Sequence, residues 1–326
     1  MPPLILVTEP EYRRAESVFD SWTFGRCVIA PSDEEALARA VKDSGAHHVV
    51  VGGQPYRGPL YASLARGSVV ARFGVGHEGI DKPQATTCGL LCTNTPYVLD
   101  QSVAELTFLL IAGAARHLPT IAGAMRDGSW APKLGSELSG KTVTIVGPGR
   151  IGRAVARIAK RGYDMRVIGY RRPESTSPLD AGEDFASVTT DLPAALGEAD
   201  FVVLLIPGVR ENAHFINRER LALMRPHAWL VNTARGIVVD ENALYDALVE
   251  GRIAGAAMDV FDREPYQPAD PNRDLRTLPN VVLTPHVGSN TPEANGGMAR
   301  RALQNIEFGE RGEFGRMDLL NPDVLR

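Results

Sequence analysis

Three stretches in the second half of the chain each place a chemically active residue just after an apolar, strand-like run. "AWLVN" leads into Arg235, "AGAAMDVF" leads to Glu264, and "VVLTP" leads into His286. Arginine offers a fork of donors that matches a carboxylate, and histidine changes charge near neutral pH. Because the carboxyl ends of parallel strands line one crevice, we expect the three side chains to converge. The alternative is a structural Arg235–Glu264 ion pair and a histidine that only starts a helix.

The elements that must position these residues read as an α/β protein. Short apolar runs alternate with amphipathic helical stretches, which predicts parallel sheets covered on both faces. There are too many strands for one small sheet, so we expect two lobes. A long helix is predicted at about 102–117, with Ser102 and Glu105 as a capping box. The clearest strand candidates are 4–7, 48–51, 69–73, 142–147, 166–170, 201–206, 228–232, 254–260 and 281–285.

The pattern G-x-G-x-x-G, which is typical of loops that bind dinucleotide phosphates, occurs twice. "GPGRIG" (147–152) follows the strand-like "KTVTIV" and opens a helix with an apolar face, which we expect to end at Gly162 before the next strand. Strand, glycine turn, helix and strand within about 30 residues form the dinucleotide motif, whose helix start attracts the pyrophosphate. The predicted cofactor residues here are Gly147, Gly149, Arg150, Ile151 and Gly152.

The earlier copy, "GVGHEG" (74–79), lacks this context. No helix of useful length follows it, because Asp81, Lys82 and Pro83 come at once. We therefore predict a glycine turn between a strand and a short helix, and no second nucleotide site.

The residues after the second strand of the dinucleotide motif favour NADP(H). NAD-binding proteins carry an acidic residue there for the ribose hydroxyls. This chain has Arg171 and Arg172 instead, and guanidinium groups bind a 2′-phosphate with charge-assisted hydrogen bonds. The alternative is that these are two ordinary surface arginines, and NAD(H) stays open as a cofactor.

Five blocks together resemble the D-isomer-specific 2-hydroxyacid dehydrogenase family, in the family's order and spacing. They are "NTPYVLDQSVAEL", "ELSGKTVTIVGPGRIG", "VNTARGIVVDENAL", "GAAMDVFDREP" and "NVVLTPHVGS". The resemblance covers essentially the whole chain and looks closest to the glyoxylate/hydroxypyruvate reductase branch. It implies a flavodoxin-like substrate-binding domain at 1–98 plus 289–326 and a doubly wound dinucleotide-binding domain at 99–288. It also implies a homodimer.

The resemblance assigns roles to residues. Arg235 would bind the substrate carboxylate and polarise the 2-keto oxygen, His286 would donate the proton, and Glu264 would orient the imidazole and favour its protonated form. The backbone of Val75 and Gly76, in the first glycine turn, would hold the substrate carboxylate. Residues on the cofactor side would be Thr233, Ala234, Asp259 and Gly288.

The implied reaction is hydride transfer between NADP(H) and a small 2-keto or 2-hydroxy acid, with glyoxylate or hydroxypyruvate as the expected substrate. An NAD-dependent D-lactate or phosphoglycerate-type dehydrogenase is one alternative, and a non-catalytic dinucleotide-sensing protein is another. Substrate identity is the least constrained point, because "GHEGID" and Tyr97 depart from the family's usual residues.

Composition excludes several other classes. A net charge of −4 and an isoelectric point near 6.0 argue against a nucleic-acid-binding protein. The longest apolar runs are far shorter than the roughly 20 residues that cross a bilayer. The three cysteines show no CxxC spacing, so neither a disulfide framework nor a metal site is predicted, and the expected compartment is the cytoplasm.

Overall fold

The computed structural model describes residues 2–174 and 182–326. Contacts between Cα atoms divide the chain into two units. Unit 1 comprises Met1–Leu99 and Ser289–Arg326, and unit 2 comprises Asp100–Gly288. The sequence predicts domain boundaries between residues 98 and 99 and between residues 288 and 289.

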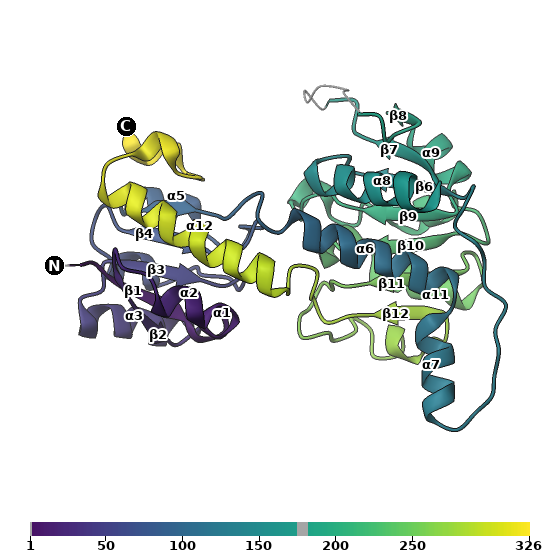
Figure 1. Ribbon diagram of the computed structural model, residues 1–326, viewed down its shortest axis with the longest axis horizontal. Helices are drawn as coiled ribbons and strands as arrows, with labels where there is room; N and C mark the ends of the chain where they lie inside the picture. Colours follow the sequence, from purple (N-terminus) through teal and green to yellow (C-terminus); the bar gives the residue numbers. More distant parts are fainter. Residues whose placement is uncertain (1, 175–181) are drawn as a thin grey trace. The chain divides into compact units, whose positions relative to one another are not determined.

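Unit 1 is built on a five-stranded parallel sheet in the order β2-β1-β3-β4-β5, which is the flavodoxin-like order. On one face, Leu6, Val49 and Val70 pack with helices α3 and α4. Helix α12 lies across the other face and contacts β4 (Figure 1). Its elements are β1 (Leu4–Thr8), α1 (Glu9–Arg14), α2 (Glu16–Asp20), β2 (Arg26–Ala30), α3 (Glu34–Ser44), β3 (His48–Val51), α4 (Leu60–Ser63), β4 (Val69–Arg72), α5 (Lys82–Thr87), β5 (Leu91–Thr93) and α12 (Pro292–Glu310).

Unit 2 holds a seven-stranded parallel sheet in the order β12-β11-β10-β9-β6-β7-β8. The chain direction across the sheet reverses between β6 and β9, which is the switch point where doubly wound sheets bind ligands. Its elements are α6 (Asp100–Ala115), α7 (Leu118–Arg126), β6 (Thr142–Val146), α8 (Arg150–Tyr163), β7 (Arg166–Tyr170), β8 (Ser187–Thr189), α9 (Leu192–Glu198), β9 (Phe201–Leu204), α10 (Arg218–Leu221), β10 (Trp229–Asn232), α11 (Glu241–Val249), β11 (Gly255–Met258) and β12 (Val281–Leu283).

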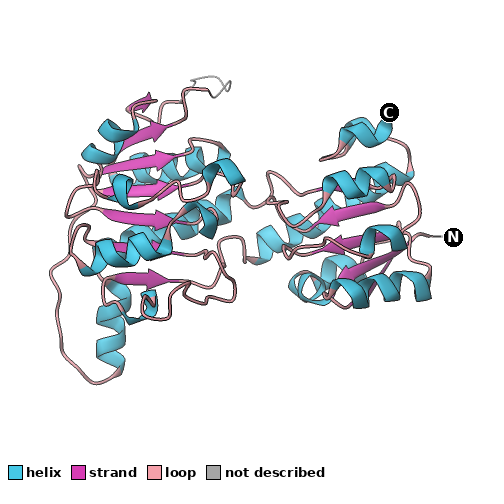
Figure 2. Cartoon of the chain, turned by 180° about the vertical axis from the view of Figure 1, so that it is seen from behind, coloured by secondary structure: helices cyan, strands magenta, loops and turns pink. Residues whose placement is uncertain are grey.

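Helices cover both faces of this sheet (Figure 2). Strand side chains alternate between the two cores, so that Phe201 and Val203 face α6 and α8 while Val202 and Leu204 face α9, α10 and α11. This alternation follows from the period of two along a strand. The structure thus confirms the predicted α/β class with two parallel sheets.

Several local predictions need correction. Helix α6 begins at Asp100, so Ser102 lies inside its first turn and is not a capping residue. Helix α8 continues through Gly162 to Tyr163, and Asp164, with φ of +49°, ends it. Strands β2, β5 and β8 were not among the clearest candidates; β5 and β8 have only three residues each, too few to show a period.

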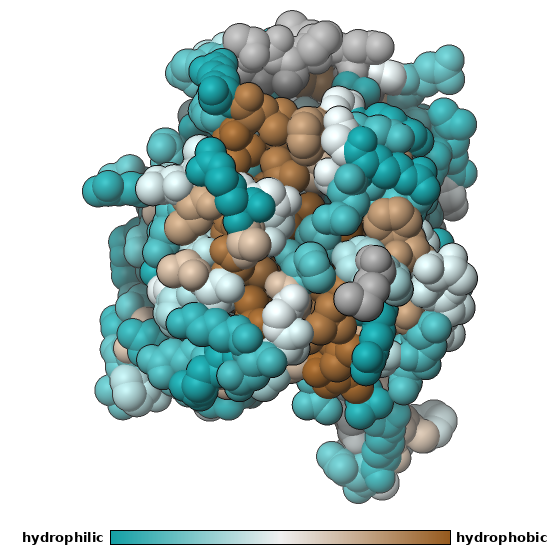
Figure 3. Space-filling view, turned by 90° about the vertical axis from the view of Figure 1, so that its left-hand side faces the viewer, coloured by the Kyte–Doolittle hydropathy of each residue, from teal (hydrophilic) through white to brown (hydrophobic). Residues whose placement is uncertain are grey.

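Within the described ranges, no single helix is both long and apolar enough to span a bilayer. Helices α6 and α7 pass that test only as a pair, and they meet at a bend of 69°. A space-filling view shows apolar patches set among hydrophilic side chains (Figure 3).

Candidate active site

The glycine turn after β6 has the shape that a dinucleotide requires. Gly147 has φ of +97°, and a Cβ on it would lie 2.6 Å from the carbonyl oxygen of Leu205. A Cβ on Gly152 would lie 2.6 Å from the carbonyl oxygen of Gly147, so glycine lets α8 pack close to the strand. Around Gly149, by contrast, no described atom lies within 4 Å of such a Cβ. A tight turn, an open approach and close helix packing are the three roles that glycines play in a dinucleotide site, so this turn fits the cofactor.

The other predicted cofactor residues of this turn occupy the start of α8. Arg150 is the first helical residue, and its Nε donates to Asp100 Oδ2 at 2.9 Å. Ile151 packs against the core beneath α6 and α8. The turn stands beside the end of β7, because the Gly147 N–H donates to the carbonyl of Tyr170 at 3.0 Å.

Arg171 and Arg172 therefore emerge next to the glycine turn. The Arg171 N–H donates to the carbonyl of Thr189 at 3.1 Å, so its backbone continues the β7–β8 ladder. The side chain of Arg172 turns toward the loop after β9, where its Nη2 donates to Asn212 Oδ1 and, at 3.0 Å, to the carbonyl of Glu211.

His286 and Glu264 form a direct pair on neighbouring loops of unit 2. Nδ1 of His286 lies 2.6 Å from Glu264 Oε2. The other oxygen, Oε1, accepts from the Phe261 N–H at 2.9 Å, which fixes the carboxylate orientation. His286 itself has φ of +52°, and its N–H donates to the carbonyl of Asp259 at 2.7 Å. With Nδ1 engaged, Nε2 is the ring nitrogen left for a substrate.

The electrostatics of this pair favour an ionised carboxylate. Burial alone raises the pKa of Glu264, but the hydrogen bonds from His286 and Phe261 outweigh it, together with the positive charges of His286 and Arg235. The net result is a pKa of Glu264 below its ordinary value. A carboxylate at Nδ1 fixes the tautomer and the orientation of the imidazole.

Arg235 stands at the end of a turn that one buried side chain shapes. Asn232, the last residue of β10, donates from Nδ2 to the carbonyl of Arg235 at 2.9 Å and accepts from the Ala234 N–H at 3.0 Å. Nη1 of Arg235 donates to the carbonyl of Ala234 at 2.6 Å. Thr233 is tied to α6, since its hydroxyl lies 2.7 Å from that of Thr107.

The Arg235 turn and the Glu264 loop pack backbone against backbone at Gly236. A Cβ on Gly236 would lie 1.8 Å from the carbonyl carbon of Phe261 and 2.1 Å from the Asp262 nitrogen. The buried side chain of Glu241 accepts from the Asp262 N–H at 2.8 Å and holds the same loop from α11. Glycine at 236 is therefore what lets Arg235 and Glu264 approach each other.

Asp259 anchors the segment that carries His286. Its side chain is 1 % exposed, and it accepts from Thr284 Oγ1 at 2.6 Å and from the N–H groups of Val287 and Gly288 at 2.9 Å each. Burial raises the pKa of Asp259, and these hydrogen bonds oppose the rise. They use three of the roughly four acceptor positions of a carboxylate.

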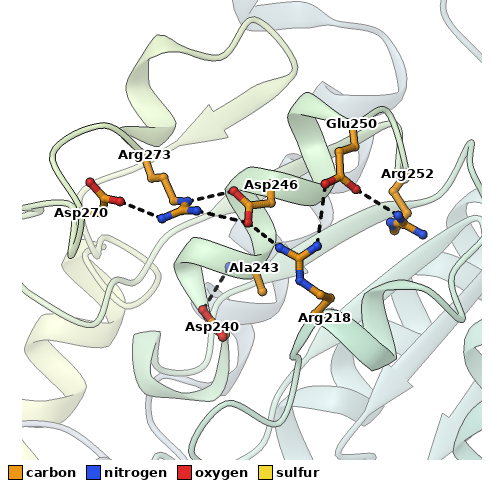
Figure 4. A network of polar contacts seen from close by, with 8 residues as sticks. All are labelled: Arg218, Asp240, Ala243, Asp246, Glu250, Arg252, Asp270 and Arg273. Carbon is orange, nitrogen blue, oxygen red and sulfur yellow. Dashed lines mark hydrogen bonds and ion pairs between the residues drawn. The ribbon is translucent and has the colours of Figure 1, made fainter.

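A network of ion pairs anchors the far end of the Glu264 loop (Figure 4). Arg273 bridges Asp270 and Asp246, with Nη1–Oδ2 and Nε–Oδ1 distances of 2.7 and 2.8 Å. Asp246 lies on α11 and also pairs with Arg218 at 2.5 Å. The hydrogen bond and charge of Arg273 lower the pKa of Asp246. The chain from β11 to β12 is thus tied to α11 at both Glu241 and Asp246.

In unit 1, the other predicted substrate residues lie in a braced turn. The Gly74 N–H donates to Thr95 Oγ1 at 2.9 Å, and the Thr95 N–H returns a bond to the Gly74 carbonyl at 3.0 Å. Asn94 Nδ2 donates to the carbonyl of Val75 at 2.8 Å. Val75 and Gly76 are both partly exposed.

Sequence reasoning missed the residues that hold these loops. They are buried polar residues that belong to no recognisable sequence motif, namely Asn232, Glu241, Asn94 and Thr95. A usable signal was present, because Asn232 ends an apolar strand and Asn94 and Thr95 directly follow one. Polar side chains at buried strand ends must find backbone partners.

Unit 2 therefore has the organisation of a nicotinamide-dependent dehydrogenase, with a dinucleotide turn at the switch point and an acid–base pair at the same sheet edge. The family model for the NAD-binding domain of D-isomer-specific 2-hydroxyacid dehydrogenases matches residues 108–288. The chain belongs to the D-isomer-specific 2-hydroxyacid dehydrogenase family, which confirms the resemblance seen in the sequence.

Named relatives fall within this family. The chain is 43% identical over 276 residues to a glyoxylate reductase of Pyrococcus furiosus, covering 82% of this chain and 80% of the relative. It is 36% identical over 324 residues to a D-3-phosphoglycerate dehydrogenase of Methanocaldococcus jannaschii, covering 98% of this chain and 60% of the relative.

A similar solved structure is the NADPH-dependent glyoxylate/hydroxypyruvate reductase of Sinorhizobium meliloti, in complex with NADP and malonate. It is 30% identical, with a TM-score of 0.78 over 94% of this chain and 93% of that one. A D-lactate dehydrogenase of Aquifex aeolicus, complexed with NAD and lactic acid, is 25% identical, with a TM-score of 0.81 over 97% and 98%. The family and a nicotinamide dinucleotide cofactor are thus established, and the two structures differ in which dinucleotide they hold.

Proposed function

We propose that this protein reduces a small 2-keto acid, glyoxylate or hydroxypyruvate, with NADPH as the preferred cofactor. The observation that carries the proposal is the His286–Glu264 pair, at 2.6 Å, on loops that follow neighbouring strands of the sheet that bears the glycine turn. The names of the relatives support the substrate class.

The residues divide the work of reduction. When bound, the reduced nicotinamide supplies a hydride to the keto carbon. Nε2 of His286 donates a proton to the keto oxygen, so that the keto acid becomes a hydroxy acid, and Glu264 stabilises the imidazolium beforehand. Arg235 binds the carboxylate and polarises the carbonyl. For unit 1 by itself, the proposed role of the Val75 and Gly76 N–H groups is to bind a carboxylate.

The same unit provides the proposed cofactor contacts. The N–H groups at the start of α8 bind the pyrophosphate, and Thr233 and Ala234 present backbone groups to the nicotinamide. Asp259 and the backbone of Gly288 are the groups that would lie on the carboxamide side of the nicotinamide. Arg171 and Arg172 bind the 2′-phosphate.

Direct binding tests the cofactor preference. NADPH and NADH are titrated separately, and we expect the lower Kd for NADPH and a loss of that preference in Arg171→Asp. Tighter NADH binding that Arg171→Asp leaves unchanged would favour the NAD-dependent alternative, of the D-lactate or phosphoglycerate type.

Turnover tests the chemistry. His286→Asn removes the proton donor, and we expect loss of NADPH oxidation with glyoxylate and hydroxypyruvate while the Kd for NADPH stays unchanged. Near-normal turnover in that variant would remove histidine from the mechanism. If the wild-type protein binds NADPH but turns over no member of a 2-keto-acid panel, the protein is a dinucleotide sensor.

We also propose a homodimer, formed through the segment from α7 to about residue 134. Helix α7 carries no buried residue although its composition is apolar, and it stands off the sheet of unit 2 (Figure 1). Leu118, Met125, Trp130 and Leu134 are exposed. Several exposed large apolar side chains on one segment are typical of protein interfaces, and the family resemblance makes a second copy the occupant.

A further inference from the structure

The loop that follows β9, "PGVREN" (207–212), contacts both arginine sites of unit 2. Gly208 lies against Arg235, so that a Cβ there would come within 2.7 Å of Arg235 Cγ. At its other end, Asn212 holds Arg172. Strands β7 and β9 flank β6, so the loop reaches past the glycine turn to make this second contact.

Arg172 is held by the buried side-chain amide of Asn212, whose oxygen and nitrogen are both hydrogen-bonded. Asn212 is 4 % exposed; its Oδ1 accepts from Arg172 Nη2 and its Nδ2 donates to the carbonyl of Pro207 at 2.8 Å. The bond to Pro207 fixes which way the amide points, since it requires Nδ2 on that side. The carbonyl of Glu211 accepts the second bond from Nη2 at 3.0 Å.

We propose that Asn212 is a positioning residue for cofactor selection, which holds the Arg172 guanidinium ready for a 2′-phosphate. This inference rests on the proposed NADP(H) preference and adds a residue to it. A guanidinium has five N–H donors. The loop uses the two on Nη2, so Nε and Nη1 are the donors assigned to the phosphate.

The physical reason is the entropy of the arginine side chain. A free arginine loses side-chain rotamer freedom when it is fixed. When Asn212 and the Glu211 carbonyl fix it beforehand, that loss is not incurred on binding NADPH. NADH has no 2′-phosphate for Arg172 to bind, so its affinity should not depend on the tether. The tether therefore affects the ratio of the two affinities.

Asn212 could also act by shaping the loop through Pro207, and a double-mutant cycle separates the two roles. We suggest measuring Kd for NADPH and for NADH by fluorescence titration in five full-length proteins: wild type, Asn212→Ala, Arg172→Ala, the double variant, and Glu211→Gln. Glu211→Gln is the matched control, because it alters an exposed side chain of the same loop and keeps the carbonyl that binds Arg172. Thermal melting checks that each variant is folded.

Asn212→Ala should raise the Kd for NADPH about tenfold, which corresponds to about 1.4 kcal/mol, and leave the Kd for NADH within about twofold. In the Arg172→Ala background, Asn212→Ala should change neither the Kd for NADPH nor the Kd for NADH. Glu211→Gln should not raise the Kd for NADPH. An equal loss of NADPH and NADH affinity, or an effect of Asn212→Ala that persists without Arg172, would overturn the inference. If Arg172→Ala itself leaves the ratio unchanged, the proposed role of Arg172 fails first and the inference falls with it.

Discussion

Replacing Gly236 by alanine should disable the site without touching any reacting group. The added Cβ would lie 1.8 Å from the Phe261 carbonyl carbon, where an ordinary contact begins at about 3.4 Å. The two backbones must therefore separate by about 1.6 Å. Misplacing a reacting group by about 1 Å costs on the order of a hundredfold in rate. Because Phe261 also orients Glu264, we expect kcat/KM to fall at least a hundredfold.

The assay is NADPH oxidation with glyoxylate, run beside NADPH titration and thermal melting. Overpacking of this kind costs about 1–3 kcal/mol of stability, so melting shows whether the variant is folded. Gly162→Ala is the matched control, since no described atom lies within 4 Å of its Cβ and alanine favours a helix. Glu241→Gln weakens the hold on the same loop without overlap and should lower kcat/KM more mildly. A folded Gly236→Ala protein with near-normal kcat/KM would refute the coupling of Arg235 to Glu264.

Two further predictions concern the proton pair and assembly. The pKa of Glu264 is lowered in the folded state, so its carboxylate stabilises the fold above the unfolded value of about 4.3 and loses that effect as pH falls through the folded pKa. The difference in unfolding free energy between wild type and Glu264→Gln should therefore shrink below about pH 4, and a difference that stays constant from pH 6 to 3 would contradict this. For assembly, sedimentation should give about twice the 35.2 kDa chain mass for wild type and a monomer for Leu118→Glu/Met125→Glu, whereas a monomeric wild type would rule out the dimer.

The strands of the sheet cores were predictable because each is a run of apolar residues long enough to show burial. All nine candidate strands form, though several end one or two residues earlier than expected; β9, for instance, was expected to reach residue 206 and ends at Leu204. Strand ends are harder to locate because apolar residues continue past the last ladder bond into the loop. Helix starts were less predictable: Ser102 and Glu105 were interpreted as a capping box, whereas α6 begins two residues earlier, at Asp100.

The types of the candidate site residues were readable from the sequence, but their geometry was not. Nothing in the spacing of Glu264 and His286 states that their side chains meet, because the 21 residues between them include a whole loop and a strand. That meeting depends on Glu241 and Asp259, whose buried carboxylates accept from backbone N–H groups of the two loops that carry Glu264 and His286. The sequence can show a polar residue at the end of an apolar strand, but it does not show the backbone partner of that residue, which only the fold supplies.

The two G-x-G-x-x-G stretches share a sequence pattern but differ in structure. In 147–152 the middle glycine faces open space and a 14-residue helix begins at the next residue, which is what a pyrophosphate requires. In 74–79 the last glycine is pressed against backbone, since a Cβ on Gly79 would lie 2.4 Å from the carbonyl oxygen of Gln54. The helix that follows has six residues and starts only at Lys82. The 74–79 stretch therefore has glycines for a different reason: Gly74, with φ of +139°, lets the end of β4 turn tightly, and Gly79 lets the loop pack against the backbone of Gln54.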